Sequence, residues 1–371
     1  MKEKLTIGVI GCGYWGPNLI RNFLSLDGST VKTVCDLSEQ RLAHIKRHYP
    51  GVATTTDAEA IFNDSAIDAV AIATPVHAHF ILAKSALSSG KHVFIEKPMA
   101  SSAAQCEELN ALASKMGLTL MVGHTFIYSD PVKKIKELLD SGEIGNIYYL
   151  SSQRLNLGLF QPDINVAWDL AAHDISIILY LFQSMPISVS CQGKAHITQG
   201  IEDVTVISMD FSSSEFAMVT SSWLDPHKVR KLVIVGSRKM IVYDDIEPIE
   251  KIKIYDKSVS VPKHYDLFGE FAYSYHYGDV LSPYFKMSEP VHNKCRHFLD
   301  CIQKAARCLS GGKEGLEVVR ILEAATESLR SNSAKIMLSQ PADHQAPGEG
   351  RQAATMAGQA LPAQAASGNH E

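Results

Sequence analysis

The feature that most constrains the fold is a glycine-rich turn near the amino terminus. Residues 5–10 read as a buried strand, Gly11-Cys12-Gly13-Tyr14-Trp15-Gly16 follows, and residues 17–24 place apolar side chains on one helix face. A second β-rich run, residues 31–35, ends at Asp36. This order of strand, glycine turn, helix and strand is typical of a dinucleotide-binding βαβ unit.

Each residue of the turn has a mechanical reason to be there. Gly11 allows the tight turn, Gly13 lets the backbone approach a pyrophosphate, and Gly16 lets the helix pack closely on the strand. Tyr14 and Trp15 lie in the same binding turn. Asp36, twenty residues after Gly16, is placed to accept hydrogen bonds from a ribose diol and to repel a 2′-phosphate, which predicts NAD rather than NADP. An ordinary strand–turn–helix corner is the alternative.

Composition bounds the class of protein. A chain of 371 residues is expected to form about two domains. A net charge of −5 gives no electrostatic footprint for nucleic acid, and the sequence has no apolar stretch long enough for a membrane span and no signal peptide pattern, which predicts a cytoplasmic protein without nucleic-acid or membrane partners. The seven cysteines are scattered, without the paired spacing of a zinc site, so we predict no metal site and reduced thiols.

The pattern changes near residue 124. Up to that point strands and helices alternate, which predicts an α/β, doubly wound parallel sheet of the Rossmann type in an NAD-binding domain, 1–124. Residues 125–338 are predicted to form an α+β substrate-binding and dimerisation domain with a large, mainly antiparallel sheet; within it, 262–290 reads as irregular. One face of that sheet needs a cover, which suggests a homodimer or homotetramer. The tail, 339–371, lacks aromatic residues and is predicted to be disordered.

Polar residues follow two buried strands, and ligands of open α/β sheets lie beyond such strand ends. Thr74-Pro75 comes after the apolar run 67–73, and Glu96-Lys97-Pro98 comes after the next strand. We expect Thr74, Pro75, His79, Glu96 and Lys97 to contact the cofactor. A lysine beside a reacting hydroxyl stabilises a developing alkoxide and relays a proton. The alternative for Lys97 is a surface lysine in a loop.

A helix predicted over 168–182 supplies a second candidate group. Asp169 and His173 are four residues apart and would share one helix face, so the carboxylate is expected to orient the imidazole and raise its pKa. Such a histidine would accept a proton from a hydroxyl. Asp174 faces elsewhere and is expected to be structural. The alternative is that Asp169 and His173 form only a structural pair.

Taken together, four motifs resemble one family. They are the glycine turn 11–16, Thr74-Pro75 with His77, Glu96-Lys97-Pro98, and Asp169-x-x-x-His173-Asp174. The chain resembles the glucose–fructose oxidoreductase / inositol dehydrogenase (Gfo/Idh/MocA) family over residues 5 to 338. The resemblance implies catalytic roles for Lys97 and His173, with Asp169 assisting. Within the family it points to bacterial enzymes that oxidise the 3-hydroxyl of a UDP-N-acetylglucosamine-type sugar for surface polysaccharide or lipid A precursors.

A diphosphate-bearing substrate needs cationic and hydrogen-bonding partners. Besides Lys97, Asp169 and His173, the candidates are His124, Tyr128, Arg154, Asn156, Asn165, Lys228 and Arg230. Solvated surface charge is an equal alternative for Lys228 and Arg230. Two other functions remain open: a 3-ketoreductase of a deoxysugar nucleotide or a dehydrogenase of inositol or a free sugar, and a non-catalytic NAD-binding sensor or scaffold.

Overall fold

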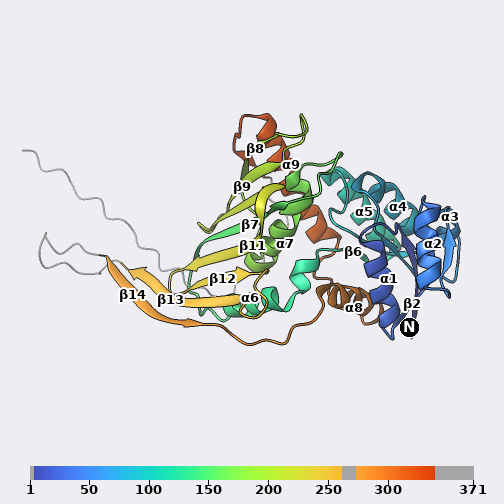
Figure 1. Ribbon diagram of the computed structural model, residues 1–371, viewed down its shortest axis with the longest axis horizontal. Coiled ribbons are helices and arrows are strands. Elements are labelled where there is room, and N and C mark those ends of the chain that lie inside the picture. The colour runs from blue at the N-terminus through green and yellow to red at the C-terminus, as the bar shows by residue number, and fades with distance from the viewer. Residues whose placement is uncertain (1–3, 261–272, 339–371) are drawn as a thin grey trace, which may run out of the picture. The chain divides into compact units, whose positions relative to one another are not determined.

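The computed structural model describes residues 4–260 and 273–338 (Figure 1). The tail predicted to be disordered, 339–371, lies outside the described residues. Residues up to 338 belong to one compact unit. No described helix combines the length and the apolar composition needed to cross a bilayer.

The first half of the chain forms a six-stranded sheet in which all neighbouring strands are parallel, in the order β3-β2-β1-β4-β5-β6. Its strands are β1 (Leu5–Ile10), β2 (Ser29–Cys35), β3 (Ala53–Thr55), β4 (Ala69–Ile72), β5 (His92–Ile95) and β6 (Leu120–Val122). Its helices are α1 (Gly16–Ser25), α2 (Glu39–His48), α3 (Glu59–Phe62), α4 (Val76–Ser88) and α5 (Ala103–Met116). Every residue of β4 is buried, as expected of a central strand covered on both faces.

The second half is built on a nine-stranded sheet with the order β14-β13-β12-β11-β7-β10-β9-β8-β15. Its strands are β7 (Ile147–Leu157), β8 (Ser188–Lys194), β9 (Val204–Asp210), β10 (Phe216–Ser222), β11 (Leu224–Gly236), β12 (Met240–Asp244), β13 (Ile252–Ser260), β14 (Ser274–Leu281) and β15 (Ile336–Met337). Only β7 and β10 pair in parallel among these strands; the other described pairs are antiparallel. The predicted fold class is therefore confirmed. The reading of 262–290 as irregular was wrong for 274–281, because this segment pairs with β13 as β14.

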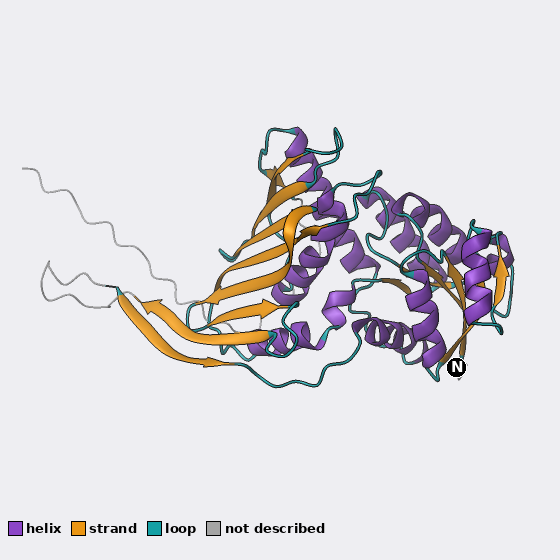
Figure 2. Ribbon diagram, in the orientation of Figure 1, coloured by secondary structure: helices purple, strands orange, loops and turns teal. Residues whose placement is uncertain are grey.

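The remaining elements are η1 (Thr125–Tyr128), α6 (Asp130–Asp140), η2 (Ala167–Ala171), α7 (Ala172–Phe182), α8 (Pro290–Gln303) and α9 (Gly312–Arg330). Helices α7 and α9 pack on the nine-stranded sheet, through β7, β8 and β10 (Figure 2). Buried side chains alternate with partly or fully exposed ones along β7 and along most of β10, so this sheet has a core face and an outward face.

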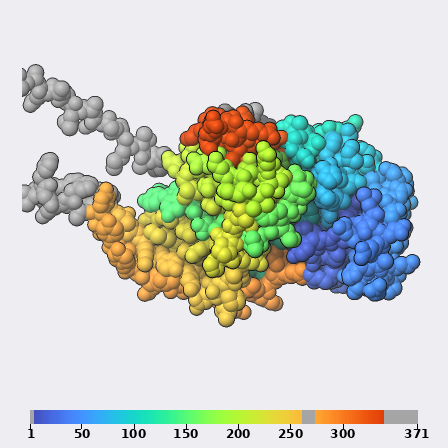
Figure 3. Space-filling view, turned by 45° about the horizontal axis from the view of Figure 1, so that its top comes forward, coloured from blue at the N-terminus to red at the C-terminus, as the bar shows by residue number. Residues whose placement is uncertain are grey.

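Helix α8 carries the chain back to the first sheet. Phe298 of α8 meets Phe23 of α1 and Phe94 of β5 edge to face, with ring centroids 6.3 and 5.7 Å away. One continuous hydrophobic cluster runs from β1 and α1 to the strands of the second sheet, and the surface view shows the amino-terminal residues (blue) meeting the middle of the chain (green) (Figure 3). The two sheets are thus joined through a shared core.

Candidate functional site

The glycine turn has the shape that its sequence predicts. Gly11 has a φ of +91°, and a Cβ there would lie 2.5 Å from the carbonyl oxygen of Ala73. A Cβ on Gly16 would overlap the carbonyl oxygen of Gly11. A Cβ on Gly13 would meet nothing closer than 3.8 Å, so its backbone is open to a ligand. Helix α1 begins here with no side-chain cap and with Pro17 in its first turn, which leaves free N–H groups for a pyrophosphate.

Asp36 lies at the end of β2, as predicted, and is fixed by the backbone of two loops. Its Oδ2 accepts a hydrogen bond from Cys12 N–H at 2.7 Å, and its Oδ1 accepts one from Ser38 N–H at 2.8 Å. Burial alone would raise the pKa of Asp36, but these backbone hydrogen bonds hold it below its usual value. The carboxylate is therefore ionised beside the turn. Arg41, a largely exposed residue, reaches within 3.7 Å of it.

Two residues predicted to contact the cofactor, His79 and Glu96, have buried side chains. Both ring nitrogens of His79 lie 2.8 Å from backbone oxygens, those of Pro98 and Thr74, and the side chain is 1% exposed. The imidazole thus holds together the loops after β4 and β5. Burial lowers its pKa. The Glu96 side chain is also buried, in the loop that follows β5 and carries Lys97.

Glu96 is held by a lysine that sequence reasoning missed. Lys294 of α8 is fully buried, and its Nζ donates to Glu96 Oε1 at 2.6 Å and to Thr125 Oγ1 at 2.9 Å. The same ammonium lies 5.4 Å from the Trp15 ring centroid and 5.3 Å from that of Phe94. A single buried cation therefore connects the glycine turn to the loop that carries Lys97. No local pattern marks it, because its partners lie about 170 to 280 residues away in the sequence.

The Lys97 ammonium crosses from the first half of the chain to the second. It donates to the backbone oxygen of Asp169 at 2.6 Å and to Asp169 Oδ1 at 3.1 Å. The other carboxylate oxygen of Asp169 accepts a hydrogen bond from Trp223 Nε1 at 3.1 Å. Since an ammonium has three N–H donors, one N–H of Lys97 is left for a ligand. Trp223, at the end of β10, is a second residue that sequence reasoning missed.

The predicted Asp169–His173 pair was wrong. Residues 167–171 form a π-helical turn, η2, and the regular α-helix α7 begins only at Ala172. Asp169 lies in η2 and His173 in α7, and both carboxylate oxygens of Asp169 accept hydrogen bonds from distant residues, Lys97 and Trp223. Asp169 pairs with Lys97 instead, and no described group bonds to His173 Nδ1. Asp174 is structural, as expected, and accepts hydrogen bonds from Ser152 and Arg154.

Three buried polar side chains at this place have atoms without partners in the described structure. They are Thr74 after β4, His124 after β6 and His173 of α7. Buried polar atoms are normally hydrogen-bonded, so a group of orphaned ones marks a place where a ligand can complete the bonding. His124 and His173 both lie within reach of the Lys97 charge, and the Thr74 side chain lies against Gly11 of the glycine turn.

Both histidines are neutral near pH 7. Burial is the largest cause that lowers the pKa of His173 well below its usual value, and Lys97 and Arg154 add to it. Burial, together with Lys97 and Lys294, lowers the pKa of His124 to about 3. The sequence-based expectation of a raised His173 pKa was therefore wrong, because the carboxylate meant to raise it binds Lys97. A neutral imidazole is a proton acceptor.

Phe126 of η1 forms part of one wall beside His173. Its ring meets the His173 ring edge to face, with 4.9 Å between the centroids. The guanidinium carbons of Arg154 and Arg230 lie 4.4 and 5.7 Å from the centroid of the same ring. Arg154 is buried and makes two hydrogen bonds to Asp174, whereas Arg230 is half-exposed and lies 3.4 Å from Asp245. Of the two arginines predicted for substrate, Arg230 therefore has the more accessible charge.

The other predicted substrate residues lie in different surroundings. Tyr128 is 1% exposed and its hydroxyl pairs with Ser310, so its predicted substrate contact is replaced by a core position. Asn165 accepts a hydrogen bond from Trp168 N–H and donates to Glu202, at the edge of a pocket of about 730 Å³ that neither Lys97 nor His173 lines. Asn156 lies beside Trp223 across Gly158, and Lys228 is exposed.

Comparison with known proteins identifies the class to which this fold and site belong. Residues 5–124 match the oxidoreductase family with an NAD-binding Rossmann fold, and residues 132–242 match the GFO/IDH/MocA C-terminal domain. The chain belongs to the GFO/IDH/MocA oxidoreductase family, which confirms the resemblance inferred from its motifs. Its first domain is the NAD-binding Rossmann fold of that family.

The relatives carry several activities, and the chain matches only about half to three-fifths of the length of three of them. A 1-carboxy-3-chloro-3,4-dihydroxycyclohexa-1,5-diene dehydrogenase of Comamonas testosteroni is 31% identical over 50% of this chain and 49% of its own. An inositol 2-dehydrogenase of Saccharopolyspora erythraea is 31% identical over 48% and 53%. A UDP-N-acetylglucosamine 3-dehydrogenase of Acidithiobacillus ferrooxidans is 29% identical over 53% and 61%. The solved structure of GenD2, from gentamicin A biosynthesis, in complex with NAD, shares the fold with a TM-score of 0.77 at 19% identity, covering 92% and 98% of the chains.

The low pKa of His124 predicts how stability changes with pH. An unfolded histidine binds a proton near pH 6.5, whereas folded His124 does so only near pH 3, so acid favours the unfolded chain. As the pH is lowered from 6.5 to about 3, the free energy of unfolding should fall in the wild type and in His124→Asn. The fall should be steeper in the wild type, by up to about 1.4 kcal/mol per pH unit. Urea unfolding at a series of pH values measures the slopes. The exposed His48→Asn serves as control, and parallel slopes for His124→Asn and wild type would contradict the prediction.

Proposed function

We propose that this protein is an NAD-dependent dehydrogenase that oxidises the 3-hydroxyl of a UDP-N-acetylglucosamine-type nucleotide sugar to the 3-keto sugar. The observation that carries the chemistry is the position of Lys97, whose ammonium from one half of the chain reaches Asp169 of the other half and whose charge acts on His173, a buried imidazole with no partner at Nδ1. Support for the substrate comes from the UDP-N-acetylglucosamine 3-dehydrogenase among the relatives. The 3-keto product suits an aminotransferase that makes surface polysaccharide or lipid A precursors.

In this proposal each side chain of the site has a separate task. Asp169, itself held by Trp223, keeps the Lys97 ammonium in place. The third N–H of Lys97 donates to the sugar hydroxyl and then stabilises the alkoxide charge. Neutral His173 accepts the hydroxyl proton on a ring nitrogen. NAD⁺ held by the glycine turn and Asp36 supplies the hydride acceptor. Arg230, above Phe126, is the cation that we assign to the diphosphate.

Substitution of the two reacting groups tests the chemistry. Lys97→Ala and His173→Ala should each lower kcat by at least about 10²-fold, the usual contribution of a positioned acid or base. Both should bind NAD normally in a fluorescence titration, because neither side chain holds the adenosine or the pyrophosphate. The exposed Lys84→Ala and His48→Ala are matched controls. Near wild-type turnover in either site variant would overturn the assignment.

The substrate is tested by product analysis on UDP-sugars, free sugars and polyols, with thermal stabilisation by NAD plus each compound as an independent readout. Turnover of inositol or a free sugar in preference to every UDP-sugar would assign the chain to another branch of its family. Binding of NAD without turnover of any sugar would instead favour a sensor or scaffold.

Asp36 should set the choice between the two nicotinamide cofactors. Its ionised carboxylate repels a 2′-phosphate, so we expect wild type to use NAD and Asp36→Ser to shift the ratio of kcat/KM values toward NADP by about tenfold or more. The neighbouring Arg41 would then be free to bind the phosphate. Asp57→Ser, an exposed acid after the adjacent strand, is the control. A wild-type preference for NADP would contradict the role of Asp36.

The outward face of the nine-stranded sheet is proposed as a homodimer or homotetramer interface. Tyr149, Phe216, Met218 and Val233 line a shallow hollow of about 510 Å³ on it, and exposed apolar patches of this kind mark association sites. Met218→Arg should reduce the assembly to smaller species in sedimentation velocity, since burying an unpaired charge is costly. Met116→Arg, elsewhere on the surface, should not. A wild type that sediments as a monomer would refute the interface.

A further inference from the structure

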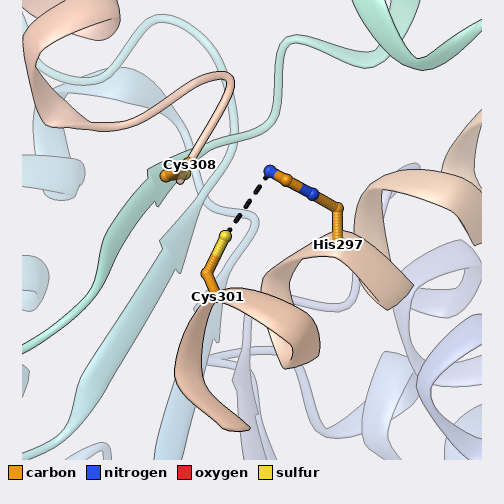
Figure 4. Close-up of side chains that lie close together, drawn as sticks. All are labelled: His297, Cys301 and Cys308. Carbon is orange, nitrogen blue, oxygen red and sulfur yellow. Dashed lines mark hydrogen bonds between the residues drawn. The ribbon is translucent and has the colours of Figure 1, made fainter. Parts of the chain in front are cut away.

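A histidine and two cysteines converge at the end of α8. Among the described residues, His297, Cys301 and Cys308 are the group of three potential ligands whose donor atoms all lie within 4.8 Å of one another. His297 and Cys301 stand one helical turn apart on α8, and Cys308 comes from the segment between α8 and α9 (Figure 4). From the sequence we predicted no metal site, because the spacing of these cysteines matches no zinc motif.

The distances are close to those of a tetrahedral metal site. With Zn–S bonds of about 2.3 Å and Zn–N bonds of about 2.0–2.1 Å, neighbouring ligand atoms lie about 3.5–3.8 Å apart. Cys301 Sγ and His297 Nε2 are 3.4 Å apart, and the third donor atom is within 4.8 Å of both. Movements of about 1 Å in the donor atoms, by side-chain rotation, would therefore bring all three within bonding distance of one ion.

The histidine presents its Nε2 to the group. His297 Nε2 accepts a hydrogen bond from Leu309 N–H at 3.1 Å, so this nitrogen carries a lone pair and the proton is on Nδ1. Nε2 also lies 3.4 Å from Cys301 Sγ (Figure 4), and an ion bound here would take over the lone pair that now accepts from Leu309 N–H. The ring itself rests against Tyr128, 5.3 Å between centroids, which limits its rotation.

The ligand set is chemically selective. Two thiolates and one imidazole favour zinc and other thiophilic metal ions over Mg²⁺ or Ca²⁺, which prefer oxygen ligands. Cys301 is buried, and Cys308 and His297 are only partly exposed, so bulk water competes weakly for the ion. Three protein ligands leave one coordination position for water or another small ligand.

We propose that His297, Cys301 and Cys308 form a binding site for one zinc-class divalent ion. The ion would tie α8 to the segment before α9 at a place that supports the candidate active site. Two residues beyond Cys308, Ser310 donates to the carbonyl oxygen of Val122 and accepts a hydrogen bond from Val122 N–H through its own carbonyl. Val122 ends β6 and is followed by Gly123 and by His124, the buried histidine described above. The role assigned to the ion is structural and does not depend on the proposed substrate.

The test measures metal directly on the full-length chain. Wild-type protein purified under reducing conditions, loaded with zinc and dialysed, should retain about one equivalent by elemental analysis. Substituting cobalt should give thiolate-to-cobalt charge-transfer absorption and the d–d bands of a tetrahedral site. Cys301→Ser, Cys308→Ser and His297→Gln should each lower the apparent affinity at least about 10-fold, the usual loss on perturbing a metal site. Cys295→Ser, on the same helix but outside the group, should retain the ion.

Thermal unfolding gives a second readout that does not depend on the variants. Zinc should raise the Tm of wild type, because an ion that binds only the folded chain stabilises it, and a chelator should reverse the shift. Three results would overturn the proposal: wild type that retains neither zinc nor cobalt, equal retention by the site variants and Cys295→Ser, or a Cys301–Cys308 disulfide in the reduced preparation.

Discussion

The ion pair between Lys97 and Asp169 is the interaction on which the site depends. It joins a loop after β5 to the π-helical turn η2, and both oxygens of the carboxylate are used, one by Lys97 and one by Trp223. A lysine side chain has several rotatable bonds, so a free Lys97 would sample many positions. Fixed on Asp169, its ammonium is held before substrate binds, which is the condition for electrostatic stabilisation of a developing charge. The π-helical turn offers Lys97 two acceptors, the backbone oxygen and the carboxylate of Asp169.

The charges of the site are arranged as pairs with two neutral imidazoles among them. Lys97 is paired with Asp169, Lys294 with Glu96, and Arg154 with Asp174. Buried ion pairs of this kind add little net stability but specify one arrangement, and removal of one partner leaves a costly unpaired charge. The cations dominate the field at His124 and His173 and, with burial, keep both rings neutral. A base is thus available without a carboxylate partner.

The sequence predicted what depends on local pattern and missed what depends on distant packing. The glycine turn, Asp36 and Lys97 follow strands whose apolar runs are visible in the sequence, so their places could be predicted from strand order alone. The Asp169–His173 pair failed because the Asp169 carboxylate bonds to Lys97 and Trp223, which lie 72 and 54 residues away in the sequence and leave no trace in the local spacing. Trp223, Phe126 and Lys294 reach the site from elements far along the chain. His79 and Tyr128 read as ligand contacts because sequence gives residue type but not burial.

Helix α8 shows why the two halves of the chain cannot be understood separately. It belongs by position to the second half, yet Phe298 packs with Phe23 and Phe94 in the first sheet's core, and Lys294 bonds Glu96 beside Lys97. Moving α8 away from the first sheet would expose these rings and strip the charge partner from Glu96, both at substantial cost. The same Lys294 ammonium lies against Trp15 of the glycine turn. One helix therefore fixes the backbone of the glycine turn and of the loop that carries Lys97 relative to each other.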